Sequence, residues 1–343
     1  MAHSRVYGHQ WNGCWQWNEE VEPPRYTDFL ELLVVDHPEF IEVLMDDTGK
    51  LHTFSNLQQP NSVVIDDGKQ DMKTLNTKDG MSYAFNNTSE WDDNKRHATL
   101  EFDTPNTTSD AKLYLTAKNS MWLDYIFGKF NEQFGSYYQQ FQAQQQTKTK
   151  EQSEKWINEQ HIPLSVYVET IEGWELVKKI NTVGPLAYRD LVVPIDSKFI
   201  KKDKLRVKLE SGFMFWEVDY VGIDFSDNLP LNVNYISPDE AKDQNNQMVT
   251  KLLSNEDKVY LTQSKIGDKV TVNFNLNNVS TTDSHSVFLK NRGYYNYIRE
   301  FKGEPNLECL KVFRKAESFT DFSKLEFYAI MDVQNRGFIA LKE

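Results

Sequence analysis

The chain has 343 residues, of which 39% are hydrophobic, 13% aromatic and 26% charged, and its formal net charge is −13. This length suits two domains, and the apolar fraction excludes a disordered chain. The negative charge argues against nucleic acid and anionic membranes as partners, because both bind to clusters of Lys and Arg. No apolar run reaches the roughly 18 residues that span a bilayer, so the sequence predicts no membrane insertion.

Neither the start of the chain nor its cysteines indicate a targeting signal or a metal. Residues 1–9 lack the apolar core of a signal peptide, which predicts either a cytoplasmic protein or a piece of a longer one. Cys14 and Cys309 form no metal-binding or redox spacing. A disulfide between them and two unrelated thiols both remain open, and two thiols are favoured because sequence alone does not place their Cβ atoms.

An internal repeat organises the chain. Residues 118–126 read Lys-Asn-Ser-Met-Trp-Leu-Asp-Tyr-Ile, and residues 290–298 read Lys-Asn-Arg-Gly-Tyr-Tyr-Asn-Tyr-Ile. Three further pairs of short blocks occur in the same order: 99–103 with 271–275, 66–83 with 243–260, and 33–36 with 221–224. Four blocks in one order predict two related units of about a hundred residues each, with a single large domain as the alternative.

Short runs of alternating apolar and polar residues dominate the first hundred positions, which is typical of β-strands. Strands are predicted at residues 14–17, 29–35, 40–45, 98–103 and 111–117. The stretch from Asp46 to Lys50 predicts a hairpin turn. A calcium site at Asp46, Asp47, Asp66 and Asp67 is the weaker interpretation, because these carboxylates do not alternate and no bidentate Glu follows them.

A helical segment interrupts the first copy. Aromatic residues keep helical spacing from Trp122 to Phe141, and a Gln-rich run continues the helix to Gln152. The second copy has no such segment, so we expect one amphipathic helix inserted into a β body. Its aromatic stripe is expected to be core rather than a ligand platform.

The second half of the chain repeats the β pattern. It predicts a hairpin at 164–168 and 174–177 and further strands at 191–195, 205–209 and 213–223, a density that indicates an antiparallel sandwich. For the C-terminal segment we expect a short helix within 307–313 and terminal strands within 319–327.

These observations predict a mainly β fold with two related antiparallel β-sandwich units and an inserted amphipathic helix. The predicted ranges are an N-terminal aromatic segment at 1–22, a first β repeat unit at 23–119, a helical insertion at 120–160, a second β unit at 161–302 and a C-terminal segment at 303–343.

Motifs for catalysis are missing from the sequence, which contains no Gly-x-Ser-x-Gly, His-Glu-x-x-His, phosphate-binding Gly-rich loop or Cys-x-x-Cys. We therefore predict no catalytic residue, no metal and no cofactor. His37 and His52 could pair across a hairpin, but two histidines without a third ligand rarely hold a metal.

Tryptophans and two carboxylates are the candidate ligand-binding residues. Trp11, Trp15 and Trp17 lie in a polar context, where exposed rings could stack on sugars. Trp216 is followed by Glu217 and Asp219, which alternate along one strand and so share a face. A core role for Trp216 and structural hydrogen bonding for the two carboxylates are the alternatives.

Several stretches resemble a family of uncharacterised, mostly exported bacterial proteins that are β-rich and contain repeats. They are Tyr26 to Leu32, Val35 to Pro38, Ile162 to Tyr167, Gly184 to Leu186 and Phe215 to Tyr220. The resemblance covers roughly residues 25 to 300 and carries no assigned activity. It implies an extracytoplasmic or cell-surface location.

The function predicted from these features is a non-catalytic extracytoplasmic binding module for a glycan or another polymer. One alternative is a structural scaffold for protein–protein interaction. Another is a carboxylate-dependent glycan hydrolase that uses Glu217 and Asp219. Binding requires several aromatic rings exposed on one patch, whereas hydrolysis requires two carboxylates facing each other at roughly 5–9.5 Å.

Overall fold

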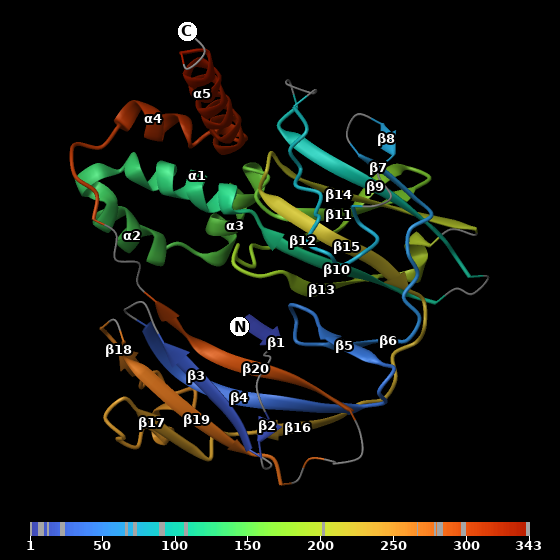
Figure 1. The fold of residues 1–343 in the computed structure, drawn as a ribbon, viewed down its shortest axis with the longest axis vertical. Helices are drawn as coiled ribbons and strands as arrows, with labels where there is room; N and C mark the ends of the chain where they lie inside the picture. The colour runs from blue at the N-terminus through green and yellow to red at the C-terminus, as the bar shows by residue number, and fades with distance from the viewer. Residues whose placement is uncertain are drawn as a thin grey trace. The chain divides into compact units, whose positions relative to one another are not determined.

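The computed structural model describes residues 2–340 except 6–9, 12–13, 21–24, 66–67, 71–73, 89–92, 106–108, 201–202, 266, 278, 280–283 and 296–299. For residues 2–20, 69–70, 146 and 333–340 it describes the backbone alone. The protein is mainly β, as predicted, with several antiparallel sheets and a group of helices (Figure 1).

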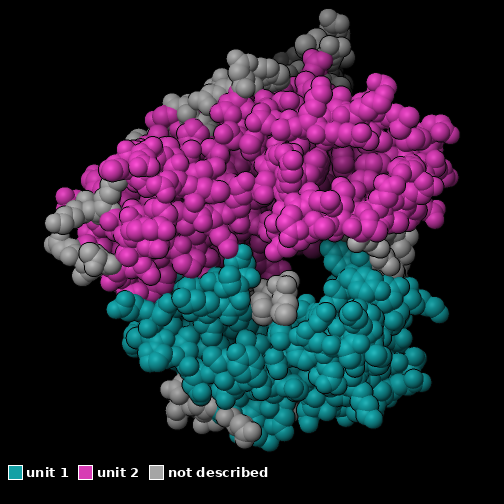
Figure 2. Space-filling view, turned by 180° about the vertical axis from the view of Figure 1, so that it is seen from behind, with its two compact units in different colours: residues 1–55, 227–299 teal, residues 56–226, 300–343 magenta. Residues whose placement is uncertain are grey.

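Two compact units make up the chain, and each combines two separate stretches of sequence (Figure 2). Unit 1 consists of residues 1–55 and 227–299, and unit 2 of residues 56–226 and 300–343. These units do not follow the predicted ranges. The reason is strand pairing, because β4 (Arg25–His37), from the predicted first β unit at 23–119, pairs along its length with β20 (Ser284–Tyr295), from the predicted second β unit at 161–302.

Unit 1 contains two main sheets and a hairpin. The five-stranded sheet has the order β1-β20-β4-β16, and β18 pairs with the start of β4, while the four-stranded sheet has the order β17-β19-β3-β2. The remaining strands of these sheets are β1 (Ala2–Arg5), β2 (Gln10–Trp11), β3 (Cys14–Glu20), β16 (Asn232–Ile236), β17 (Glu240–Asp243), β18 (Leu261–Gln263) and β19 (Lys269–Asn275).

Strand β4 is buried on both faces, which explains its nearly continuous apolar sequence. Leu32 and Val34 pack against the four-stranded sheet, in a cluster that includes Val272 of β19. Leu33 and Val35 point the other way, toward the hairpin of β5 (Glu42–Met45) and β6 (Leu51–Phe54). Alternate residues of one strand therefore fill two cores.

The predicted hairpin turn between β5 and β6 is confirmed. The Asp46 carboxylate accepts the backbone N–H groups of Thr48 and Lys50 at 2.9 and 3.0 Å, and Gly49 has a φ of +88°. These are the hydrogen bonds and the backbone angle that such a turn requires.

Unit 2 is a sandwich of a three-stranded sheet, β13-β10-β15, and a six-stranded sheet, β12-β11-β14-β9-β7-β8. Its strands are β7 (Ser62–Ile65), β8 (Lys69–Gln70), β9 (Lys95–Asp103), β10 (Ala111–Asn119), β11 (Leu164–Thr170), β12 (Gly173–Ile180), β13 (Arg189–Ile195), β14 (Lys204–Gly212) and β15 (Trp216–Asp224). Leu113 and Leu115 of β10, Val166 of β11 and Val207 of β14 belong to one buried cluster. This core places the hydrophobic faces of the two sheets against each other.

The inserted helix is present but is divided into three. These helices are α1 (Met121–Glu132), α2 (Tyr138–Gln146) and α3 (Lys150–Glu159), with the 3₁₀ turn Gly135–Tyr137 before α2. Glycine is required at position 135, where the 3₁₀ turn begins, because the φ there is +48° and a Cβ would lie 2.5 Å from the Gly303 carbonyl oxygen. Thr149 begins α3 with a capping box to Gln152.

The C-terminal segment is helical, so the predicted terminal strands are wrong. The predicted short helix is α4 (Leu307–Val312), but the residues expected to form strands belong to α5 (Ser318–Ala340). Phe319, Ser323 and Phe327 are four residues apart and lie along one helix face. Phe319 is fully buried in the unit 2 core, and Phe327 contacts the ring of Trp122.

None of the helices in the described part of the chain combines the length and the apolar character needed to cross a lipid bilayer.

Candidate functional site

Three tyrosine rings lie together where three strands of unit 1 meet. The register places Tyr26 of β4 opposite Tyr294 of β20 on one side and opposite Thr262 of β18 on the other. The Tyr26 and Tyr294 rings are stacked with centroids 4.6 Å apart, and Tyr260 contacts them edge-on at 6.4 and 5.2 Å. Opposite residues of antiparallel strands share a face, so the pairing itself brings Tyr26 and Tyr294 together, and Tyr260 directly precedes β18, which pairs with the same end of β4.

A β-bulge allows the close approach of the two strands that carry the stacked rings. The register between β4 and β20 shifts between Arg292 and Gly293. A Cβ on Gly293 would lie 2.3 Å from the backbone oxygen of Tyr26, a distance that side-chain carbons do not tolerate. Glycine at this position therefore permits both the bulge and the ring stacking.

Charged side chains continue the same face of β20, because Lys290, Arg292 and Tyr294 alternate along the strand. Arg292 Nη1 donates to Glu256 Oε2, and Lys290 Nζ lies 3.4 Å from Glu256 Oε1. Arg292 Nε also lies 3.5 Å from the buried Asp28 carboxylate. The hydrogen bond from Arg292 is the largest influence on Glu256 and lowers its pKa, so this carboxylate is ionised beside the rings.

We refer to Tyr26, Tyr260, Tyr294, Arg292 and Glu256 as the tyrosine surface. Tyr294 is 47% exposed, Tyr26 and Tyr260 are half-buried, and the Arg292 side chain is 43% exposed. Apolar rings, donors and acceptors are thus accessible within one small area of unit 1.

Trp216, a predicted platform residue, is instead part of the unit 2 core. Its side chain is fully buried, and its Nε1 donates to the Ile162 backbone oxygen at 2.8 Å. A ring with no exposed surface does not stack on a ligand, so this expectation is corrected, and the core alternative for Trp216 holds.

Glu217 and Asp219 are held by separate partners on β15. Glu217 faces Lys118 across the sheet, with Nζ and Oε2 3.0 Å apart, and accepts the Tyr188 hydroxyl at 3.3 Å. Asp219 is 4% exposed and accepts the Gly80 N–H at 2.8 Å. Burial raises the pKa of Asp219. Both carboxylates are thus engaged by neighbouring protein groups, as the structural alternative requires.

The three N-terminal tryptophans are placed by backbone only. Trp11 belongs to β2, and Trp15 and Trp17 belong to β3, where they lie opposite Phe274 and Val272 of β19. Their side chains fall outside the described part of the chain, so their binding role stays a prediction.

The two histidines and Cys309 have surroundings other than a metal site, whereas the side chain of Cys14 lies outside the described part of the chain. His37 contacts the Ser286 hydroxyl at 3.0 Å, whereas His52 contacts Asp46 at 2.8 Å. Cys309 has a free thiol whose pKa is raised by burial, which disfavours the reactive thiolate. Among the described residues no group of three or more His, Cys, Asp or Glu side chains has the arrangement of a metal site.

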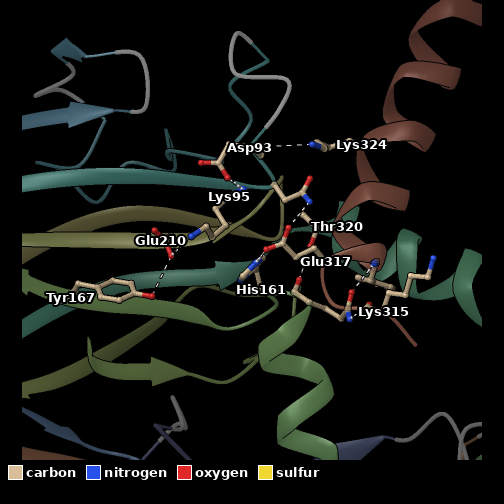
Figure 3. Close-up of polar contacts among 12 residues, drawn as sticks. Asp93, Lys95, His161, Tyr167, Glu210, Lys315, Glu317, Thr320 and Lys324 are labelled. Carbon is tan, nitrogen blue, oxygen red and sulfur yellow. Dashed lines mark hydrogen bonds and ion pairs between the residues drawn. The ribbon is translucent and has the colours of Figure 1, made fainter. Parts of the chain in front are cut away.

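A second polar cluster lies within unit 2 and connects the C-terminal helix α5 to the rest of that unit (Figure 3). His161 Nε2 lies 2.9 Å from Glu317 Oε1, and Asn94 Nδ2 donates to the other Glu317 oxygen at 3.0 Å. The Thr320 hydroxyl donates to the Gln160 backbone oxygen at 2.7 Å. The contact with His161 is the main reason that the pKa of Glu317 is lowered. These bonds connect α5 to the end of α3, so we assign this cluster a structural role.

No protein-family model matches the chain, and comparison with curated proteins finds no match. The functional argument therefore depends on the tyrosine surface itself. Tyr26, Tyr260 and Tyr294 were not among the residues predicted from the sequence. The available signal was the alternation of Lys290, Arg292 and Tyr294 inside the second copy of the repeat, which predicts a strand face carrying both charge and an aromatic ring.

Proposed function

We propose that the chain is a non-catalytic binding module whose ligand lies on the tyrosine surface of unit 1. The observation that carries the proposal is the half-exposed cluster of Tyr26, Tyr260 and Tyr294 beside the ion pair of Arg292 and Glu256. Binding sites commonly combine apolar ring surface with a few oriented polar groups, and this surface has both.

A sugar polymer is the ligand class that fits this combination best. A sugar ring presents C–H groups on its face and hydroxyls around its rim, so an aromatic ring can cover the face. Arg292 can donate hydrogen bonds to those hydroxyls, and the ionised Glu256 can accept them. The resemblance to exported bacterial proteins supports an extracytoplasmic location, where such polymers occur.

A protein partner is the second candidate, since exposed Tyr and Arg are also enriched at protein interfaces. It would bind the same residues but would not require a repeating sugar. Selective binding of one glycan class separates the two proposals.

The hydrolase alternative receives less support from the geometry. A retaining or inverting mechanism needs one carboxylate free to protonate the leaving group and another free to act on the sugar or on water. Glu217 is instead paired with Lys118, and Asp219 is buried against the Gly80 N–H. These contacts explain both carboxylates as parts of the β-sheet structure.

A glycan array of the intact chain tests the proposal, with Tyr294→Ala as the test variant and Tyr235→Ala as the matched control. Tyr235 is 65% exposed on β16 of the same five-stranded sheet, but it lies outside the tyrosine surface. We expect Tyr294→Ala to weaken binding at least about tenfold, as for a residue at the centre of a contact, and Tyr235→Ala to bind like the wild type. A folded wild type that binds no glycan, or a Tyr294→Ala variant that binds normally, contradicts the proposal. A parallel variant with Ala at Trp11, Trp15 and Trp17 tests the N-terminal prediction.

A further inference from the structure

Two cations and three carboxylates of unit 1 lie at and beside the tyrosine surface. Lys290 Nζ is 3.4 Å from Glu256 Oε1 and 3.8 Å from Glu31 Oε2. Arg292 Nη1 donates to Glu256 Oε2, and Arg292 Nε is 3.5 Å from Asp28 Oδ2. Each cation is thus placed between two carboxylates, and Glu256 is shared by both cations.

The neighbouring charges among the described residues do not reverse this balance. Arg25 directly precedes Tyr26 on β4, so it belongs to the other face of that strand. Asp257 and Lys258 follow Glu256 in the same loop, and their charges offset each other. The chain as a whole has a net charge of −13. An anionic ligand would therefore meet a surface on which carboxylates outnumber cations.

Asp28 keeps the charge of Arg292 in use within the protein. Its side chain is fully buried, and it is the bulged residue of β4, opposite the step from Arg292 to Gly293. Asp28 Oδ1 accepts the Lys258 backbone N–H at 2.7 Å, whereas Oδ2 has no hydrogen bond among the described residues. A buried carboxylate without a nearby cation is costly. A ligand that drew Arg292 away would therefore leave Asp28 without its compensating charge.

The same arrangement leaves Arg292 able to bind uncharged groups. A guanidinium has five N–H groups, and the contacts of Arg292 with described residues involve Nη1 and Nε. Nη2 can therefore donate to a hydroxyl while the charge of the side chain stays balanced. The ionised Glu256 accepts from hydroxyls as well, but it repels a carboxylate or a sulfate.

We infer that the tyrosine surface selects uncharged glycans and excludes glycans that carry carboxylate or sulfate groups. This inference rests on the proposed glycan binding and adds the chemical class of the ligand. Glu256 determines the selectivity, because it lies beside the rings and is shared by Arg292 and Lys290. Asp28 is a positioning residue, because it acts on the ligand through Arg292.

A paired glycan array of the intact chain tests the inference. It carries gluco-, manno- and galacto-oligosaccharides, each printed beside its form oxidised to a carboxylate at C6, so that the members of a pair differ mainly in charge. The wild type is expected to bind at least one neutral member, and to bind its carboxylated form at least about tenfold more weakly at low ionic strength. Added salt should narrow this ratio, because it screens the repulsion between exposed charges.

Glu256→Gln is the variant that should change the selectivity. It keeps an acceptor oxygen but removes the carboxylate shared by Lys290 and Arg292, so the ratio of neutral to carboxylated affinity is expected to fall about tenfold. Glu256 is exposed, and we expect this variant to fold. Glu240→Gln is the matched control, since it removes a carboxylate 2.7 Å from Lys242 Nζ on β17, outside the tyrosine surface. We expect it to leave the ratio unchanged.

The possible results separate this inference from the proposed function. A wild type that binds carboxylated members as tightly as neutral ones would overturn the selectivity and leave the binding proposal in place. The selectivity would also be overturned by a ratio that does not respond to salt, which indicates exclusion by shape, or by an unchanged ratio in Glu256→Gln. A folded wild type that binds no member of the array would contradict both.

Discussion

Each unit contains a strand pair with a Lys-Asn sequence on one strand and a glutamate opposite the lysine on the other. The two chains of residues differ after that asparagine. In unit 2, β10 pairs with β15, and Lys118 lies opposite Glu217 with 3.0 Å between Nζ and Oε2. In unit 1, β20 pairs with β4, and Lys290 lies opposite Glu31 at 3.8 Å. An asparagine follows each lysine. The Lys-Asn sequence of the predicted repeat thus occupies the same position in both pairs.

The two residues after the Lys-Asn sequence differ between the units, and the chain continues as a helix in unit 2 and as a strand in unit 1. Ser120 caps α1 in unit 2, where its hydroxyl accepts the Leu123 N–H at 3.0 Å. In unit 1 the corresponding residues are Arg292 and Gly293, which continue the strand past a bulge in β4 to Tyr294. A helix cap therefore begins the helical group of unit 2, whereas in unit 1 a glycine opposite the bulge of β4 lets β20 continue to the tyrosine surface.

The wider strand pairing extends the comparison. In unit 2 the orders β13-β10-β15 and β14-β9-β7 occur, and in unit 1 the orders β1-β20-β4 and β3-β19-β17 occur. The similar blocks 99–103 and 271–275 lie in β9 and β19, which hold equivalent places. Interleaved copies of one strand set would produce this pattern. The internal repeat itself stays a prediction.

The largest effect is expected from removing a core ring of unit 2. Trp216→Ala should lower the free energy of unfolding by about 3–5 kcal/mol, because a fully buried indole leaves a cavity. Hydrogen exchange should show the loss in the strands of unit 2, with glycan binding by the folded fraction unchanged. Reduced affinity at an unchanged folded fraction would contradict the assignment of Trp216 to the core.

Gly293→Ala should act on unit 1 instead. The added Cβ would clash with the Tyr26 backbone oxygen, and we expect a loss of about 1–3 kcal/mol together with weaker ligand binding. Urea denaturation and a binding titration measure both effects. Gly128→Ala in α1 is the control, since apart from its chain neighbours and its own helix backbone no atom lies within 4 Å of its added Cβ, and alanine favours helix by up to about 1 kcal/mol. Equal stability and equal ligand affinity of the two variants would argue against a requirement for glycine at position 293 in unit 1.

A smaller difference is expected in acid. Burial raises the pKa of Asp46 in the β5–β6 hairpin, but hydrogen bonds from Thr48, His52 and the Lys50 backbone outweigh it and lower the pKa to about 2, from its ordinary value of 3.8. The folded pKa is the lower one, so this stabilisation is complete above pH 3.8 and is lost as the pH falls toward 2. Solvent screening reduces it to about 1 kcal/mol. Asp46→Asn should remove that part of the pH dependence of unfolding, and an unchanged profile would contradict the assignment.

The smallest effect concerns the equivalent lysine pairs. Double-mutant cycles with Lys118→Met and Glu217→Gln, and with Lys290→Met and Glu31→Gln, should give coupling energies of about 0.5 kcal/mol or less, because both pairs are partly exposed. The first cycle should give the larger value, since its atoms are closer. A larger coupling energy for Lys290 and Glu31 than for Lys118 and Glu217 would contradict this expectation.

Local patterns predicted most strands but not their partners. The apolar run around Leu33 and the alternation around Leu113 predict strands, and Asp46 to Lys50 predicts a turn, because these signals act over a few residues. The pairing of β4 with β20 joins residues about 250 positions apart, and no short pattern encodes it. The apolar residues at 319–327 predict strands of mixed period, although the four-residue spacing of Phe319, Ser323 and Phe327 also fits the helix that the structure contains.

The candidate site also depends on contacts between distant parts of the chain, which local patterns do not predict. A tryptophan beside two carboxylates predicts a binding residue at Trp216, but its burial is decided by the packing of two sheets and not by neighbours in sequence. Tyr26, Tyr260 and Tyr294 come from three separate stretches and become one surface only through the register of β18, β4 and β20.

The most direct test of the binding proposal is a titration of the intact chain with the best glycan from the array, comparing the wild type, Tyr294→Ala and Tyr235→Ala under identical conditions. The tyrosine surface predicts saturable binding by the wild type and by Tyr235→Ala, with affinity at least about tenfold lower for Tyr294→Ala. Equal affinity of all three folded proteins would contradict the placement of the ligand on unit 1.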